Sequence, residues 1–154
     1  MSRISEKFKQ LQTKGQKAFI PFLMAGDPNM KITKKLVYEA EKRGADIIEL
    51  GMPYSTPLAD GPTIKKAGKR SLENSTNLDD IFKLVESIRE ESNVPLVLMG
   101  YYNLVFNYGL EKFVNKCEEV GVDGTIIPDL PIGEDQELRD LTTKLDVISL
   151  VTTT

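Results

Sequence analysis

The sequence predicts one α/β domain built on a parallel sheet, and two patterns in its 154 residues indicate this. Apolar runs such as AFIPFLMA (18–25) and VPLVLMGY (94–101) fit strands that are buried on both faces. Stretches with apolar residues at helical spacing separate the runs, so strands and helices alternate. A strand recurs about every 30 residues, which suits a (β/α) barrel or an open doubly wound sheet. No G-x-G-x-x-G follows the first strand, which argues against a dinucleotide-binding sheet.

Five elements are expected in the first half of the chain. They are a helix over residues 2–14, a strand over Ala18–Ala25, a helix between the cap Asn29 and Gly44, a strand over Asp46–Met52 and a helix over Thr63–Glu73. The first helix places Ile4, Phe8 and Leu11 on one side among lysines. We expect that side to cover the bottom of a core; the alternative is a helix lying on a membrane.

Six elements are expected in the second half. They are a helix capped by Asn77, a strand over Val94–Tyr101, a helix over Leu110–Val120, a strand over Gly124–Ile127, a helix over Glu134–Leu145 and a strand over Val147–Val151. Asn77 precedes an apolar stripe, as a helix cap should. The last helix is expected to bury Leu138, Leu141 and Leu145. The elements form one domain over residues 1–154 without a linker.

Composition excludes several classes of function. The formal net charge of −3 suggests neither nucleic acid nor an anionic membrane as a partner. The chain has no His and a single Cys, so it lacks Ser-His-Asp catalysis and the usual ligands of zinc or iron–sulfur sites. Cys117 reads as a small core residue. No apolar run approaches the length of a membrane span and no signal peptide is evident, so a soluble cytoplasmic protein without a metal is expected.

Two carboxylates are the best-placed catalytic candidates. Glu49 interrupts the apolar strand IIEL, and a loop with three prolines then leads to Asp60. Burying a carboxylate is costly unless it is paired, so a chain that keeps one there usually uses it for acid–base chemistry. The alternative is an edge strand with a solvated Glu49. In a barrel, Glu49, Tyr101 and Asp129 would all lie near the C-terminal ends of strands, with Asp60 on the same rim.

A resemblance to a known family selects between the two folds. The segment IELGMPYSTPLADGPTI resembles the signature E-L-G-x-P-[FY]-S-D-P-x-A-D-G-P of the tryptophan synthase alpha subunit family. FIPFLMAGDP, GYYNLVF and VDGTIIPDLP are similar to that family as well, so the resemblance covers essentially the whole chain. It implies a TIM (β/α)8 barrel with an extra N-terminal helix, represented here by about five strands. Thr56 departs from the pattern, because an acid is usual there.

The resemblance also implies an activity and a set of residues. The reaction is the retro-aldol cleavage of indole-3-glycerol phosphate to indole and glyceraldehyde 3-phosphate in tryptophan biosynthesis, without a cofactor. The implied catalytic residues are Glu49 and Asp60, and the implied substrate-lining residues are Phe22, Met99 and Tyr101. The positions that match the rim facing a beta subunit are Pro53, Thr56, Asn103, Asp129 and Pro131. The partner is expected to be a tryptophan synthase beta subunit in an α2β2 complex.

Alternatives stay open at this point. Phe22 and Met99 could be plain barrel core. Lys65 or Lys66 could serve a Schiff-base aldolase, and the chain could be a non-catalytic barrel that only binds a beta subunit. With five strands where the family has eight, we expect a chain truncated at its C-terminal side. Its apolar edges, AFIPFLMA and VISLV, would favour self-association, and it would bind phosphorylated substrate poorly.

Overall fold

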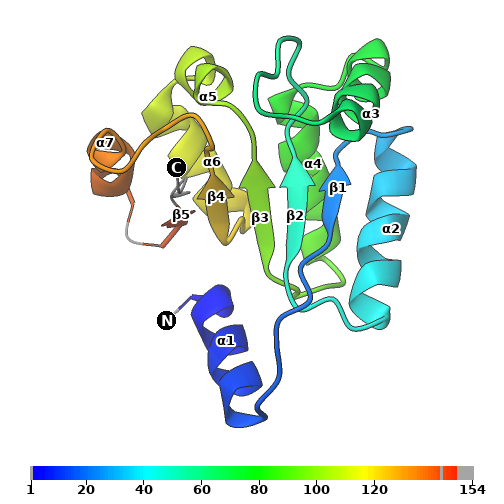
Figure 1. Ribbon diagram of the computed structural model, residues 1–154, viewed down its shortest axis with the longest axis vertical. Coiled ribbons are helices and arrows are strands. Elements are labelled where there is room, and N and C mark those ends of the chain that lie inside the picture. Colours follow the sequence, from blue (N-terminus) through cyan, green and yellow to red (C-terminus); the bar gives the residue numbers. More distant parts are fainter. Residues whose placement is uncertain (1, 143, 149–154) are drawn as a thin grey trace.

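The computed structural model of the chain describes residues 2–142 and 144–148 and contains one five-stranded parallel sheet (Figure 1). The strands are β1 (Phe22–Met24), β2 (Ile48–Gly51), β3 (Leu96–Met99), β4 (Gly124–Ile126) and β5 (Asp146–Ile148). Their order in the sheet is their order in the sequence, and all four pairings are parallel. A doubly wound sheet needs a point where this order reverses. The unbroken order is therefore that of a (β/α) barrel, as predicted.

Helices cover one face of this sheet. The helices are α1 (Arg3–Thr13), α2 (Met30–Lys42), α3 (Pro62–Glu73), α4 (Leu78–Arg89), α5 (Tyr102–Tyr108), α6 (Leu110–Val120) and α7 (Gln136–Asp140). Helices α2, α4 and α6 pack side by side behind the strands (Figure 1). Ile48, Leu50 and Leu98 point from the strands into this layer and are fully buried with the helical side chains. The main core therefore lies between sheet and helices.

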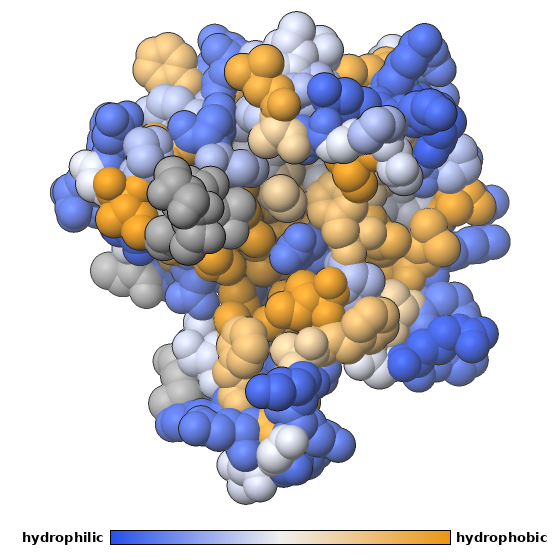
Figure 2. Space-filling model, in the orientation of Figure 1, coloured by the Kyte–Doolittle hydropathy of each residue, from blue (hydrophilic) through white to orange (hydrophobic). Residues whose placement is uncertain are grey.

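The opposite face of the sheet carries a smaller apolar cluster. Ile47, Val97 and Ile126 point to this side and are joined by Ile4 from α1, which lies across the bottom of the sheet. The expectation that the first helix covers the bottom of a core is thus confirmed for Ile4 and Leu11, whereas Phe8 is 47% exposed. Figure 2 shows hydrophobic residues gathered across this front face, between α1 below and the rim above.

Three aspartate carboxylates connect neighbouring elements through the same kind of hydrogen bond. Each accepts a hydrogen bond from a backbone N–H 27 residues away: Asp46 from Phe19 (2.9 Å), Asp123 from Leu96 (2.8 Å) and Asp129 from Tyr102 (2.8 Å). The separation is about one strand–helix–strand unit, so each bond fixes a loop of one strand against the start of another element. Asp129 also satisfies an N–H at the beginning of α5.

The structure corrects several expected boundaries. Strands β1 to β4 are shorter than predicted. The last strand begins at Asp146, one residue before its predicted start, and residues 149–151 of the predicted range lie outside the described residues. Helix α5 lies in a stretch for which no element was predicted; its three aromatic residues and Val105 do not favour a helix. Helix α7 ends at Asp140, and Leu141 is 37% exposed instead of buried. Among the described residues, no helix is long and apolar enough to cross a membrane.

Candidate active site

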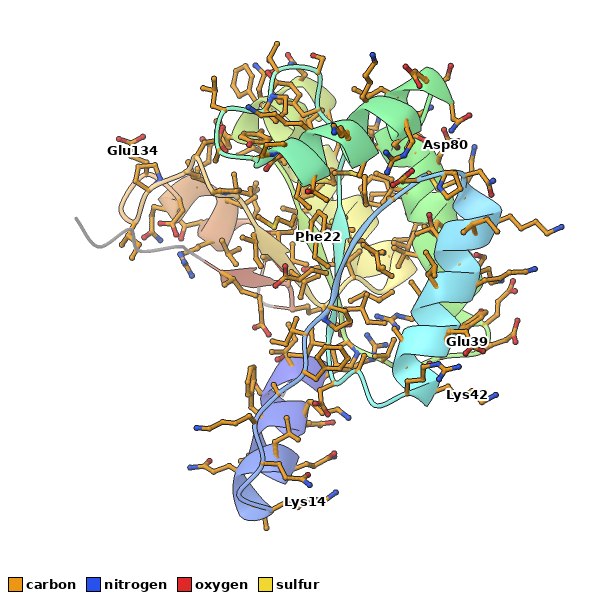
Figure 3. All side chains as sticks on the ribbon, turned by 45° about the vertical axis from the view of Figure 1, so that its right-hand side comes forward. Lys14, Phe22, Glu39, Lys42, Asp80 and Glu134 are labelled. Carbon is orange, nitrogen blue, oxygen red and sulfur yellow. The ribbon has the colours of Figure 1, made fainter. Side chains whose placement is uncertain are left out.

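The open face of the sheet presents two rungs of side chains at its centre. The lower rung is Phe22, Glu49 and Val97, and the upper rung is Met24, Gly51 and Met99, each in register across β1, β2 and β3. Side chains alternate between faces along a strand, so both rungs point away from the helices. Figure 3 labels Phe22 near the middle of the sheet.

Glu49 is a carboxylate in largely apolar surroundings. Strand β2 lies between β1 and β3, so the alternative of a solvated glutamate on an edge strand is wrong. Its side chain is half-buried, and among the described residues no hydrogen bond or salt bridge to its carboxylate is found. Burial raises the pKa of Glu49 above its usual range. Such a group can hold a proton at a pH where an ordinary glutamate has released it.

Asp60 lies above these rungs, at the wall of a small pocket. The pocket is lined by Phe22, Met24, Gly51, Met52, Asp60, Ile64, Met99, Gly100, Tyr101 and Pro128. Strand ends, the loops that follow them and the start of α3 meet there, and all three residues expected to line a substrate slot are part of the lining. Phe22 and Met99 are half-buried and border the pocket, and Met99 also packs against the smaller apolar cluster. Glu49 itself is not part of the lining, although it lies directly beside Phe22 across β1 and β2.

Tyr101 connects the pocket to the loop that carries Asp60. Its hydroxyl accepts a hydrogen bond from the backbone N–H of Ala59 at 2.9 Å, and its ring packs on Tyr54 with 5.3 Å between centroids. Burial raises the pKa of Tyr101, and the neighbouring Asp60 carboxylate raises it further. The phenol therefore stays protonated beside Asp60. Sequence reasoning placed Tyr101 at the site but missed this loop contact, because a backbone donor leaves no signal in the sequence.

Gly51 shapes the floor of the pocket. The Phe22 ring lies directly over its Cα, in the space that a Cβ would occupy. Only glycine allows this close approach of the Phe22 ring to the strand. The role of Gly51 in the motif is therefore steric.

The five positions matched to a partner rim differ in their surroundings. Thr56, Asn103 and Pro131 are exposed on loops and on α5, above the C-terminal ends of the strands. Asp129 is exposed too, although its carboxylate already accepts the Tyr102 N–H. Pro53 is buried, so a partner would contact its loop neighbours rather than its ring.

The remaining candidate groups lie away from the pocket. Lys65 and Lys66 are exposed on α3, and neither lines the pocket that holds Asp60. Cys117 is fully buried, and burial raises the pKa of its thiol, as expected of a core residue. Within residues 2–142 and 144–148, no three His, Cys, Asp or Glu side chains are grouped so that they could hold a metal ion.

Comparison with known proteins links this geometry to one family. The family model described as tryptophan synthase alpha chain matches residues 8–154. The tryptophan synthase alpha chain of Alkaliphilus metalliredigens is 50% identical over 156 residues, which cover 100% of this chain and 59% of the relative. The chain thus spans little more than half the length of such curated relatives.

Solved structures give the same result. The tryptophan synthase alpha subunit of Legionella pneumophila superposes with a TM-score of 0.92 at 37% identity, over 97% of this chain and 57% of that one. A chain from the tryptophan synthase α2β2 complex of Pyrococcus furiosus gives 0.83 at 34% identity, over 87% of this chain and 54% of that one.

Proposed function

Because the chain belongs to the tryptophan synthase alpha chain family, we propose that it carries the acid–base part of a lyase site in tryptophan biosynthesis. The site would cleave indole-3-glycerol phosphate to indole and glyceraldehyde 3-phosphate. The observation that carries this proposal is Glu49, a half-buried carboxyl with a raised pKa beneath a pocket that contains a second carboxylate, Asp60. Paired carboxyls in different surroundings are a common way to divide acid and base roles.

Glu49 would move the protons. Cleavage of the bond between indole C3 and the glycerol chain needs a proton delivered to C3 and a proton removed from the chain hydroxyl. A carboxyl with a raised pKa can give the first proton and then accept the second, so that it returns to its starting state. The apolar rung around Glu49 supplies the raised pKa that this double role requires.

Asp60 would act by its charge. Protonation at C3 places positive charge on the indole ring, and an ionised carboxylate that accepts the indole N–H would stabilise that charge. The Tyr101 hydroxyl and the Ala59 N–H keep the loop in place next to it. Phe22 and Met99 provide an apolar wall for an aromatic ligand.

The assay is release of indole from indole-3-glycerol phosphate. The chain is measured alone and fused to the part of the Alkaliphilus relative that its match does not cover. We expect Glu49→Gln to abolish release while the fold survives, because the amide has the same shape but exchanges no proton. Glu39→Gln, on the outer side of α2 (Figure 3), is the matched control and should keep the wild-type rate. A Glu49→Gln rate above roughly a tenth of wild type would contradict the role of Glu49.

We further propose that the rim above the strands binds a tryptophan synthase beta subunit, in an α2β2 complex in the cytoplasm. Thr56, Asn103 and Pro131 are exposed there and offer contact positions. A chain and fusion that both bind a beta subunit but release no indole would instead identify a non-catalytic binding protein.

A further inference from the structure

Helix α3 occupies an unusual place for a helix that follows a strand of a parallel sheet. It lies above the C-terminal end of β1 rather than in the layer formed by α2, α4 and α6 (Figure 1). The helix begins at Pro62, only two residues after Asp60, and the Lys65 N–H bonds back to the Gly61 carbonyl at 3.0 Å. Any movement of α3 would therefore carry Asp60 with it.

Three side chains near the C-terminal end of α3 hold it to the turn after β1. Arg70 donates two hydrogen bonds to the Asp27 carboxylate, from Nε to Oδ1 at 2.8 Å and from Nη2 to Oδ2 at 2.7 Å. The Ser71 hydroxyl donates to the Ala25 carbonyl (2.5 Å), and the Asn74 amide donates to the Pro28 carbonyl (2.6 Å). We call this set of six residues the α3 clamp.

The backbone of the turn is shaped to let α3 approach closely. Gly26 lies at the centre of the α3 clamp with φ +80, and a Cβ there would overlap the side chains of Thr76 and Ser71. The Gly26 N–H is bound by Thr33 at 3.1 Å, which holds the turn to α2 as well. Glycine satisfies both the left-handed backbone and the steric limit.

The ion pair in the α3 clamp differs from the surface pairs on single helices. Asp27 is only 17% exposed, whereas Arg70 is 53% exposed, and the two residues are 43 positions apart in sequence. The hydrogen bonds from Arg70 lower the pKa of Asp27. A bidentate guanidinium–carboxylate pair fixes orientation as well as distance, which a single contact does not.

We propose that the α3 clamp positions Asp60 for the reaction, with the Arg70–Asp27 pair as its orienting contact. This inference rests on the proposed function of Asp60. The loop that carries Asp60 is supported on one side by Tyr101 through the Ala59 N–H and on the other by α3. Arg70 and Asp27 are thus positioning residues. They act through a rigid helix on a carboxylate that they do not touch.

Hydrogen exchange across residues 54–66 of the whole chain tests the positioning directly. In Arg70→Met we expect these amides to exchange roughly tenfold faster, with no change in α4 and α6. Arg70→Lys, which keeps the charge but not the fork, should give an intermediate rate. Arg43→Met is the matched control, because Arg43 forms only an exposed pair with Glu39 on α2, and it should leave the segment unchanged.

A second variant tests the same idea without altering a charge. Gly26→Ala should push α3 away from the turn and accelerate exchange in the same segment. Unchanged exchange in both Arg70→Met and Gly26→Ala would overturn the proposal. So would acceleration spread equally over α4 and α6, since that result reports general destabilisation.

Steady-state kinetics measure the effect of the α3 clamp on activity. In the active protein, Arg70→Met should lower kcat by roughly 10- to 100-fold, the range expected for a catalytic group displaced by about an ångström. KM should change less than about twofold, since Arg70 does not line the pocket. An unchanged kcat would contradict the inference. A wild-type protein without indole release would refute the proposed function alone, and the exchange measurement would still decide whether the α3 clamp holds the Asp60 loop.

Discussion

Replacement of Asp123 by alanine should be the most destabilising single change among the charged residues of this fold. Asp123 is 5% exposed at the N-terminal side of the sheet, and it has three donors. They are Arg3 Nη1 at 2.7 Å, Arg89 Nη2 at 2.7 Å and the Leu96 N–H at 2.8 Å. Its carboxylate therefore joins helix α1, helix α4 and strand β3.

The magnitude follows from what each donor loses. The Leu96 N–H is buried and would lose its partner, which costs about 1 to 3 kcal/mol. The Arg89 side chain is 12% exposed and would still donate to three backbone carbonyls. Removing its Asp123 partner should therefore cost about 1 to 2 kcal/mol, less than leaving a buried charge without any partner. Arg3 is 40% exposed and adds at most about 0.5 kcal/mol. Together, Asp123→Ala should cost about 2 to 5 kcal/mol.

Urea unfolding followed by circular dichroism measures this loss. With a slope of about 2 kcal/mol per molar, the midpoint should fall by roughly 2 M. Asp123→Asn keeps an acceptor for the Leu96 N–H and should lose only about 1 to 2 kcal/mol. Glu39→Ala removes an exposed carboxylate paired with Arg43 and should change stability by less than about 0.5 kcal/mol. An Asp123→Ala variant as stable as the Glu39→Ala control would refute this reasoning.

Three further predictions concern the site and the rim. Because burial raises the pKa of Glu49, the folded state binds this proton more tightly than the unfolded state does. The contribution of Glu49 to the stability of the protein therefore falls as the pH rises. Glu49→Gln should therefore have a higher Tm than wild type at pH 8 but not below pH 4.5, the ordinary value; a pH-independent difference would contradict this. Asp60→Asn should lower kcat by roughly 100-fold and ligand affinity much less, since the charge is needed mainly in the transition state; unchanged kinetics would remove Asp60 from the mechanism. Thr56→Asp should tighten binding to a beta subunit by roughly two- to fivefold in titration calorimetry, the range of one exposed ion pair, and equal affinities would refute it.

The sequence by itself determined the elements and the candidate residues. Alternating apolar runs and helical stripes predicted five strands and most helices, since these signals act over a few residues. A carboxylate within IIEL indicated Glu49, because an apolar strand tolerates a charge only at a cost. The family resemblance, carried by the motif around Glu49 and by FIPFLMAGDP, indicated Asp60, Phe22 and the barrel fold.

Only the tertiary structure decided how these residues are supported. Arg70 meets Asp27 across 43 residues, and nothing near either residue in the sequence indicates the other. The order of the strands removed the solvated alternative for Glu49, since it placed β2 between two neighbours. The capping of α5 by Asp129 likewise depends on the packing of adjacent loops, not on local propensity. The physical reason is the sequence distance over which the interactions act. Hydrophobic periodicity and helix capping involve residues a few positions apart, whereas a hydrogen-bond partner from another element depends on strand register and close packing across the whole sheet.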